Sequence, residues 1–133
     1  MNRTRFFRGF TLIELMVVVL ILAVLAALVV PRVLSKAEQA KDAAAKTDLA
    51  TFSQALSSFR LDCDRYPTTD EGLPALRQAP SDLSAKWKGP YIEKDVPVDP
   101  WKNPYHYLCP GSTGDKDSYD LYSDGGSSGR IDK

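Results

Sequence analysis

A long apolar run near the start of the chain is the clearest pattern in the sequence. Residues 10–30 are apolar apart from Thr11 and Glu14, and they follow the basic segment MNRTRFFRG. Because an α-helix rises about 1.5 Å per residue, about 20 such residues cross the roughly 30 Å hydrocarbon core of a bilayer. The run is longer than the roughly 7–15 apolar residues of a signal-peptide core, and no A-x-A-like site closes it. We therefore expect a membrane-spanning helix that is not removed as a signal peptide.

The charges around this run predict its orientation. Arg3, Arg5 and Arg8 precede it, and the positive-inside rule places such a basic segment in the cytoplasm. Basic residues also follow the run between residues 32 and 46, which weakens the bias. The sequence predicts a single-pass protein with a cytoplasmic N-terminus and the remainder on the other side of the membrane.

The helical pattern continues beyond the apolar run to about residue 62. Large apolar residues recur there at steps of three and four and mark one helix face: Leu49, Phe52, Leu56 and Phe59. We expect this face to pack on a globular head. Residues 35–46 are rich in alanine and charge, and we expect them to project as a stalk. Pro31 removes one backbone hydrogen bond and can kink the helix where it leaves the membrane.

The rest of the chain predicts a small sheet preceded by an irregular connection. Most of the nine prolines lie between Pro67 and Pro104, which favours loops with one short helix near residues 71–78. Residues 105–109 and 118–122 show the alternation typical of antiparallel strands. The predicted fold class is α+β, with a long N-terminal helix packed on a small antiparallel sheet, an irregular αβ loop and a C-terminal loop.

Glu14 places a charge where charge is unfavourable. An ionisable side chain at the centre of a membrane helix costs about 2.5–3.5 kcal/mol and indicates a partner. One interpretation places Glu14 near the interface, where the positive end of the helix dipole favours it. The other begins with a peptidase that cuts after the small Gly9 and leaves a positive amine on Phe10. That amine could pair with Glu14 of an adjacent copy, with an attraction that is stronger in a low dielectric than in water.

The residues around this position resemble a known processing signal. The segment R-G-F-T-L-I-E-L at residues 8–15, with an apolar run that ends at Pro31, is similar to the class III signal of type IV pilins and type II secretion pseudopilins. The resemblance implies that a prepilin peptidase cleaves between Gly9 and Phe10 and methylates the amine of Phe10. It also implies that Glu14 guides subunit assembly and that the segment before Pro31 unwinds as subunits enter a filament.

Downstream segments are similar to one branch of this superfamily, the major pseudopilin of type II secretion, or general secretion pathway protein G family. They are residues 44–62, 65–73, 99–111 and 118–125. Ordinary type IV pilins share the N-terminus but lack the R-Y-P-T-T and D-P-W-x-N-P-Y segments. The resemblance implies a type IV pilin-like fold in four parts. These are a leader at 1–9, a transmembrane and assembly helix at 10–30, an amphipathic stalk helix at 31–62 and a periplasmic head at 63–133.

The resemblance also implies the function. We expect a structural subunit of the periplasmic pseudopilus, a helical homopolymer whose growth drives protein export across the outer membrane. The expected partners are the prepilin peptidase, minor pseudopilins, the inner-membrane assembly platform and the inner membrane itself. Two alternatives remain: a type IV pilin for adhesion, motility or DNA uptake, and a monomeric membrane-anchored binding domain.

Composition and motifs argue against other classes. The chain has 17 basic and 17 acidic side chains, so loss of the three leader arginines gives a net charge of minus three and disfavours nucleic acid as a partner. The sequence has no H-E-x-x-H motif and no phosphate-binding glycine loop, and we do not expect an enzyme. Trp87 and Trp101 are expected to be packing residues and His106 an ordinary strand residue.

The two cysteines lie outside the apolar run. Cys63 and Cys109 are expected in the periplasm, where disulfides form and persist. We predict a bond between them that ties the end of the long helix to the first strand. Two free thiols are the alternative.

The C-terminal segment predicts either a disordered end or a cation-binding loop. Residues 110–133 are rich in Gly, Ser and Asp, and calcium takes six to eight oxygen ligands from such loops. The EF-hand pattern does not match. Major pseudopilins hold a structural calcium here, and the resemblance implies Asp124 and Asp132 as ligands, with backbone carbonyls of Leu121 and Ser123. The loop is shorter than is usual in the family.

Overall fold

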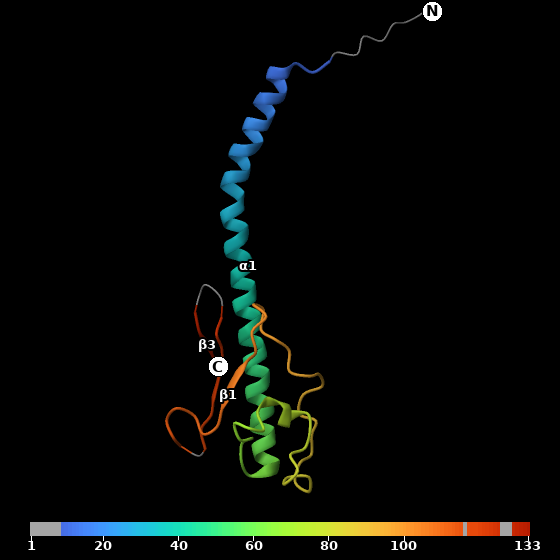
Figure 1. Ribbon diagram of the computed structural model, residues 1–133, viewed down its shortest axis with the longest axis vertical. Helices are drawn as coiled ribbons and strands as arrows, with labels where there is room; N and C mark the ends of the chain where they lie inside the picture. The colour runs from blue at the N-terminus through green and yellow to red at the C-terminus, as the bar shows by residue number, and fades with distance from the viewer. Residues whose placement is uncertain (1–8, 116, 126–128) are drawn as a thin grey trace, which may run out of the picture. The chain divides into compact units, whose positions relative to one another are not determined.

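The computed structural model describes residues 9–115, 117–125 and 129–133 (Figure 1). In chain order the elements are α1 (Leu12–Cys63), the 3₁₀ helix η1 (Leu73–Leu76), β1 (His106–Leu108), β2 (Asp120–Ser123) and β3 (Ile131–Asp132). The predicted α+β fold, a long N-terminal helix and a small antiparallel sheet, is confirmed. The chain divides into two compact units, Met1–Ala37 and Glu38–Lys133, and α1 contributes to both.

The first unit is built on the N-terminal half of α1. Thr11 caps this helix, because its hydroxyl accepts the Glu14 amide at 3.2 Å and its carbonyl accepts the Leu15 amide at 3.2 Å. The helix continues without a break through Pro31. Among the described residues, α1 is the one helix whose length and composition would allow it to cross a membrane.

The second unit packs the C-terminal half of α1 against the sheet and the loops. The predicted apolar face of the helix is buried: Leu49, Leu56 and Phe59 are each 0% exposed and Phe52 is 4% exposed. They join one core cluster with residues of the sheet, namely Tyr107, Leu121 and Ile131. The 3.6-residue periodicity therefore predicted correctly which side of the helix faces the head.

The predicted projecting stalk at residues 35–46 is only partly observed. Ala45 is fully buried, and the Trp101 indole Nε1 donates to Glu38 Oε2 at 3.0 Å. Small alanine side chains let the loop that carries Trp101 approach the helix here. The expected stalk thus contacts the head from Glu38 onward.

The sheet has the strand order β1-β2-β3, with both pairs antiparallel. In the register, Tyr107 pairs with Leu121 and Ser123 with Ile131, and these four residues form the buried face. The two predicted strands are present with shifted ends. The third strand, β3, was not predicted, because it has only two residues and lies in the Gly- and Ser-rich tail.

Candidate functional site

The predicted cleavage site lies just before α1. Gly9 and Phe10 are in irregular, exposed backbone, and Phe10 is 83% exposed. A Cβ at Gly9 would meet none of the described residues within 4 Å. An accessible peptide bond outside a helix is the kind of substrate that a peptidase requires, and the structure places this bond there.

The predicted assembly residue, Glu14, lies in the first turn of α1 and is exposed. Within the described residues its carboxylate has no hydrogen-bond or ion-pair partner. The apolar side chains that follow it are exposed too; among them are Leu15, Met16, Leu20, Leu25 and Leu28. Within the described residues, this half of the helix therefore presents one carboxylate on an exposed apolar surface.

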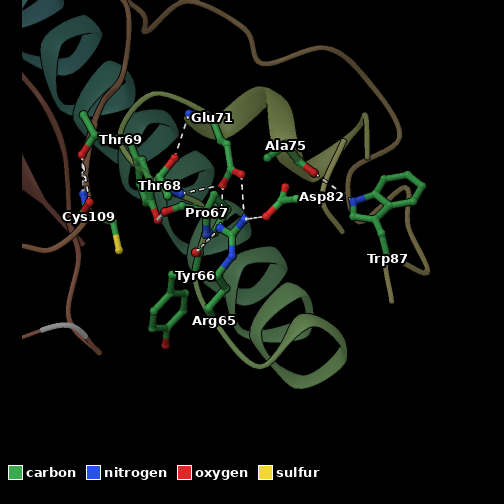
Figure 2. A network of polar contacts seen from close by, with 11 residues as sticks. Arg65, Tyr66, Pro67, Thr68, Thr69, Glu71, Ala75, Asp82, Trp87 and Cys109 are labelled. Atoms are coloured by element: carbon green, nitrogen blue, oxygen red, sulfur yellow. Dashed lines mark hydrogen bonds and ion pairs between the residues drawn. The ribbon is translucent and has the colours of Figure 1, made fainter. Parts of the chain in front are cut away.

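The R-Y-P-T-T-D-E segment forms a polar network that sequence reasoning missed (Figure 2). Arg65 binds both carboxylate oxygens of Glu71 at 2.7 Å and one oxygen of Asp82 at 2.9 Å. Glu71 accepts the amide of Thr68 at 2.7 Å, and the Thr68 hydroxyl accepts the amide of Glu71 at 3.3 Å. This reciprocal pair has the bonding pattern of a capping box, here on the turn that precedes η1, and the spacing Thr-x-x-Glu could have predicted it.

The charges in this network stabilise one another. The hydrogen bonds to Glu71 raise the pKa of Arg65, and those from Arg65 hold the pKa of Glu71 below its usual range. Further hydrogen bonds hold the loop in place. The Thr69 hydroxyl donates to the Cys109 carbonyl at 3.0 Å and accepts the Cys109 amide at 2.9 Å, and the Trp87 indole donates to the Ala75 carbonyl at 3.0 Å. The segment is therefore a rigid connection between α1 and the sheet.

Asp99, in the D-P-W-K-N-P-Y segment, is a buried hydrogen-bond acceptor that is only 2% exposed. It accepts the hydroxyl of Ser123 at 2.6 Å and the amides of Trp101 at 3.0 Å and Asn103 at 2.7 Å. Burial alone would raise the pKa of Asp99, but the hydrogen bonds outweigh it and hold this pKa below its usual range. The carboxylate thus joins this loop to β2 at Ser123.

We expect Asp99→Asn to lower the free energy of unfolding at neutral pH and to lower it less in acid. A folded-state pKa below the unfolded value of about 3.9 contributes stability above that pH, and this contribution is lost as pH falls through the folded pKa. The variant should lose about 1–3 kcal/mol at pH 7. Urea unfolding of full-length protein in detergent measures this from pH 7 to pH 3, and the difference in free energy of unfolding between variant and wild type should become smaller as pH falls. A difference that stays constant or grows in acid would contradict this assignment.

Three acids of α1 accept hydrogen bonds from aromatic side chains of the head: Glu38 from Trp101 at 3.0 Å, Asp48 from Tyr105 at 2.7 Å and Asp62 from Tyr91 at 2.9 Å. The bond from Trp101 lowers the pKa of Glu38, and that from Tyr91 lowers the pKa of Asp62. Trp87 and Trp101 pack against the core, as predicted. The acids were not predicted, because their aromatic partners lie 29 to 63 positions away.

The predicted disulfide is not formed in the structure, where Cys63 and Cys109 are both free thiols. Cys63 is buried, and its burial raises the pKa of the thiol. Its side chain contacts Tyr91, whereas Cys109 is held by its backbone bonds to Thr69. Each cysteine is thus positioned by its own neighbours, and a suitable separation in sequence does not supply the geometry of a bond.

The two acids predicted to bind calcium each have a nitrogen partner. His106 Nε2 lies 2.8 Å from Asp124 Oδ2, and Arg130 Nε donates to Asp132 Oδ1 at 2.7 Å. Both pairs are on the solvent side of the sheet. Among the described residues, no group of three or more His, Cys, Asp and Glu side chains comes together as a metal site.

The other two predicted ligands are backbone carbonyls. The carbonyl of Leu121 accepts the amide of Lys133 at 3.3 Å, and the hydroxyl of Ser123, which is not the predicted ligand atom, donates to Asp99. This arrangement of the described residues does not fit a calcium ion. Residues 126–128 of the same loop lie outside the described residues, and calcium binding stays a prediction.

Comparison with known families gives two matches that together span almost the whole chain. The family described as "Type II secretion system (T2SS), protein G" matches residues 32–132. The prokaryotic N-terminal methylation motif matches residues 4–30. The second match covers the predicted cleavage site and Glu14.

Individual proteins agree with these matches. The chain is 50% identical to the type II secretion system core protein G of Pseudomonas aeruginosa over 119 residues, which cover 88% of this chain and 84% of that protein. It is 44% identical to the protein of the same name from Vibrio cholerae over 127 residues, which cover 94% and 86% of the two chains. The crystal structure of the major pseudopilin of the type 2 secretion system of enterohaemorrhagic Escherichia coli matches with a TM-score of 0.59 and 30% identity, over 75% of this chain and 91% of that one.

Proposed function

The chain belongs to the type II secretion system protein G family, the major pseudopilins, and on that premise we propose how it is processed, inserted and assembled. Members of this family are structural subunits of the pseudopilus that serves protein export. The hydrophobic N-terminal helix anchors such a subunit in the inner membrane.

The first step is cleavage of the leader. A prepilin peptidase cuts between Gly9 and Phe10 and methylates the new amine of Phe10. The methylation motif that matches residues 4–30 supports this step, as does the exposed, non-helical backbone at the bond. Residues 10–30 remain in the inner membrane, with their N-terminal end at the cytoplasmic face and the head in the periplasm.

Assembly is the second step. The amine of Phe10 in one subunit pairs with the Glu14 carboxylate of its neighbour, and the apolar side chains along the first half of α1 pack against those of other subunits. The single observation that carries this proposal is a Glu14 carboxylate that has no partner among the described residues, on a helix half whose apolar side chains are exposed. The product is a periplasmic homopolymer that minor pseudopilins and the assembly platform help to build.

A secretion assay tests this function. Deletion of the gene should block release of exoproteins, and the wild-type gene should restore it. A Gly9→Val variant should be inserted but fail to restore secretion, because a Cβ at Gly9 meets none of the described residues within 4 Å and the change acts on cleavage by the peptidase. Normal exoprotein release in the deletion strain, with loss of adhesion, motility or DNA uptake instead, would show a type IV pilin.

A further inference from the structure

The solvent face of the three-stranded sheet carries a compact group of interacting side chains. The register places His106 opposite Tyr122 and Tyr122 opposite Asp132. Because side chains alternate along a strand, Asp124 and Arg130 project from the same face, each two residues from a member of this row. All three strands therefore contribute to one group on the outside of the sheet.

Tyr122 is the centre of this group. The His106 ring stacks on it with a centroid distance of 4.8 Å and an interplanar angle of 17°. The Arg130 guanidinium carbon lies 3.7 Å from the centre of the Tyr122 ring. Since β1 and β3 flank β2, the imidazole and the guanidinium approach the ring from opposite sides. The phenol ring is thus held between two nitrogen-bearing side chains.

Each of these two side chains also holds an acid. His106 bonds Asp124 at the end of β2, and Arg130 bonds Asp132 in β3. The His106–Asp124 pair therefore connects β1 to the end of β2, whereas the Arg130–Asp132 pair is local to β3, and Arg130 connects this strand to β2 through the Tyr122 ring. These are the two acids that would be needed as ligands of a cation.

The two backbone segments at the ends of the C-terminal loop also lie close together. A Cβ at Gly125 would lie only 1.9 Å from the carbonyl oxygen of Gly129, so the two backbones are in close contact. Both glycines have positive φ angles, 67° and 83°, which other residues rarely adopt. This close approach holds the two ends of the loop together.

We propose that a group of five side chains holds β2 and β3 together in place of a bound metal ion. The group, which we call the side-chain lock, consists of His106, Tyr122, Asp124, Arg130 and Asp132. The fold of this head then does not depend on calcium. Arg130 is the central residue, because it provides a permanent positive charge to Asp132 and covers the Tyr122 ring.

Thermal unfolding of the full-length protein in detergent at pH 7 tests the proposal. The Tm of wild type should be the same, within about 1 °C, in millimolar calcium chloride and in EGTA. A calcium-dependent rise of several degrees would overturn the proposal and establish the predicted metal site. This part of the test needs no substitution and does not depend on filament assembly.

Arg130→Gln tests the lock itself. We expect a fall in Tm of about 5 °C, equal in calcium and in EGTA. Lys86→Gln is the matched control, because Lys86 makes an exposed ion pair with Asp64 at 2.8 Å but has no described ring contact. The control should shift Tm by less than about 2 °C. Equal shifts for the two variants would show that Arg130 contributes no more than an ordinary surface pair, and the lock would be wrong.

Discussion

Replacing Glu14 with alanine should abolish assembly of the filament while leaving membrane insertion intact. The carboxylate is exposed on the first turn of α1, and the proposed partner is the amine of Phe10 on a neighbouring subunit. Two unit charges about 4 Å apart attract by about 4 kcal/mol at an effective dielectric constant of about 20. Loss of that attraction weakens each subunit contact by roughly a thousandfold. Insertion should not suffer, because removal of a charge makes the helix easier to insert.

Cross-linking and electron microscopy of sheared filaments measure this effect. Glu14→Gln keeps the shape of the side chain and removes its charge, so it should fail as completely as Glu14→Ala. Leu15→Ala is the comparison, since it trims the exposed apolar surface at the adjacent position but keeps the charge, and it should lower the yield of filaments without abolishing them. Wild-type filaments from Glu14→Gln would show that charge pairing does not direct assembly.

Replacing Phe59 with alanine should have the largest effect on the stability of the head. Phe59 is fully buried on α1, and its ring packs edge-on against Tyr91 with the centroids 5.7 Å apart. Removal of a buried phenylalanine side chain costs about 3–5 kcal/mol. A domain of this size has about 5–15 kcal/mol of stability in total, so the variant should lose a large share of it.

Urea unfolding followed by tryptophan fluorescence measures the loss, because both tryptophans lie in the second unit and pack on its core. Leu61→Ala is a control on the same helix. Leu61 is 84% exposed, and its truncation should change stability by less than about 0.5 kcal/mol. If both variants unfolded at the same urea concentration, the assignment of the buried face would be wrong.

Periodicity predicted the elements that rest on local patterns. The apolar face of α1 repeats at helical spacing over several turns, so the buried positions Leu49, Leu56 and Phe59 could be read directly. The helix end was expected near residue 62 and lies at Cys63. The alternation that predicted β1 and β2 was equally local. In contrast, β3 is too short to show any alternation and forms only because β2 is beside it.

Contacts between distant residues were not predictable in the same way. Nothing in the spacing of Glu38 and Trp101 indicates that the loop carrying Trp101 lies on the helix. The hydrogen bond between these two side chains and the burial of Ala45 nevertheless show that part of the expected stalk packs on the head. The two cysteines are a second case of distant residues. Their number and expected compartment favoured a bond, the structure has both thiols free, and the bond stays a prediction.

Motifs indicated where the candidate sites lie but not which side chains pair with one another there. The Gly9-Phe10 junction and Glu14 were found from the sequence alone, and they fall within the matching methylation motif. The acids Asp124 and Asp132 were also found, but as metal ligands. Their partners on the sheet, His106 and Arg130, became apparent only when the strands were placed side by side.

Mass spectrometry of the N-terminus is the most direct test of the central claim, that cleavage of the leader creates the amine which Glu14 of another subunit binds. The protein should be extracted from the membranes of its own host, without a tag at the N-terminus. We expect the N-terminal peptide to begin with N-methylated Phe10. Mature protein that still begins at Met1 would contradict this account, since no amine would then be present at the start of α1.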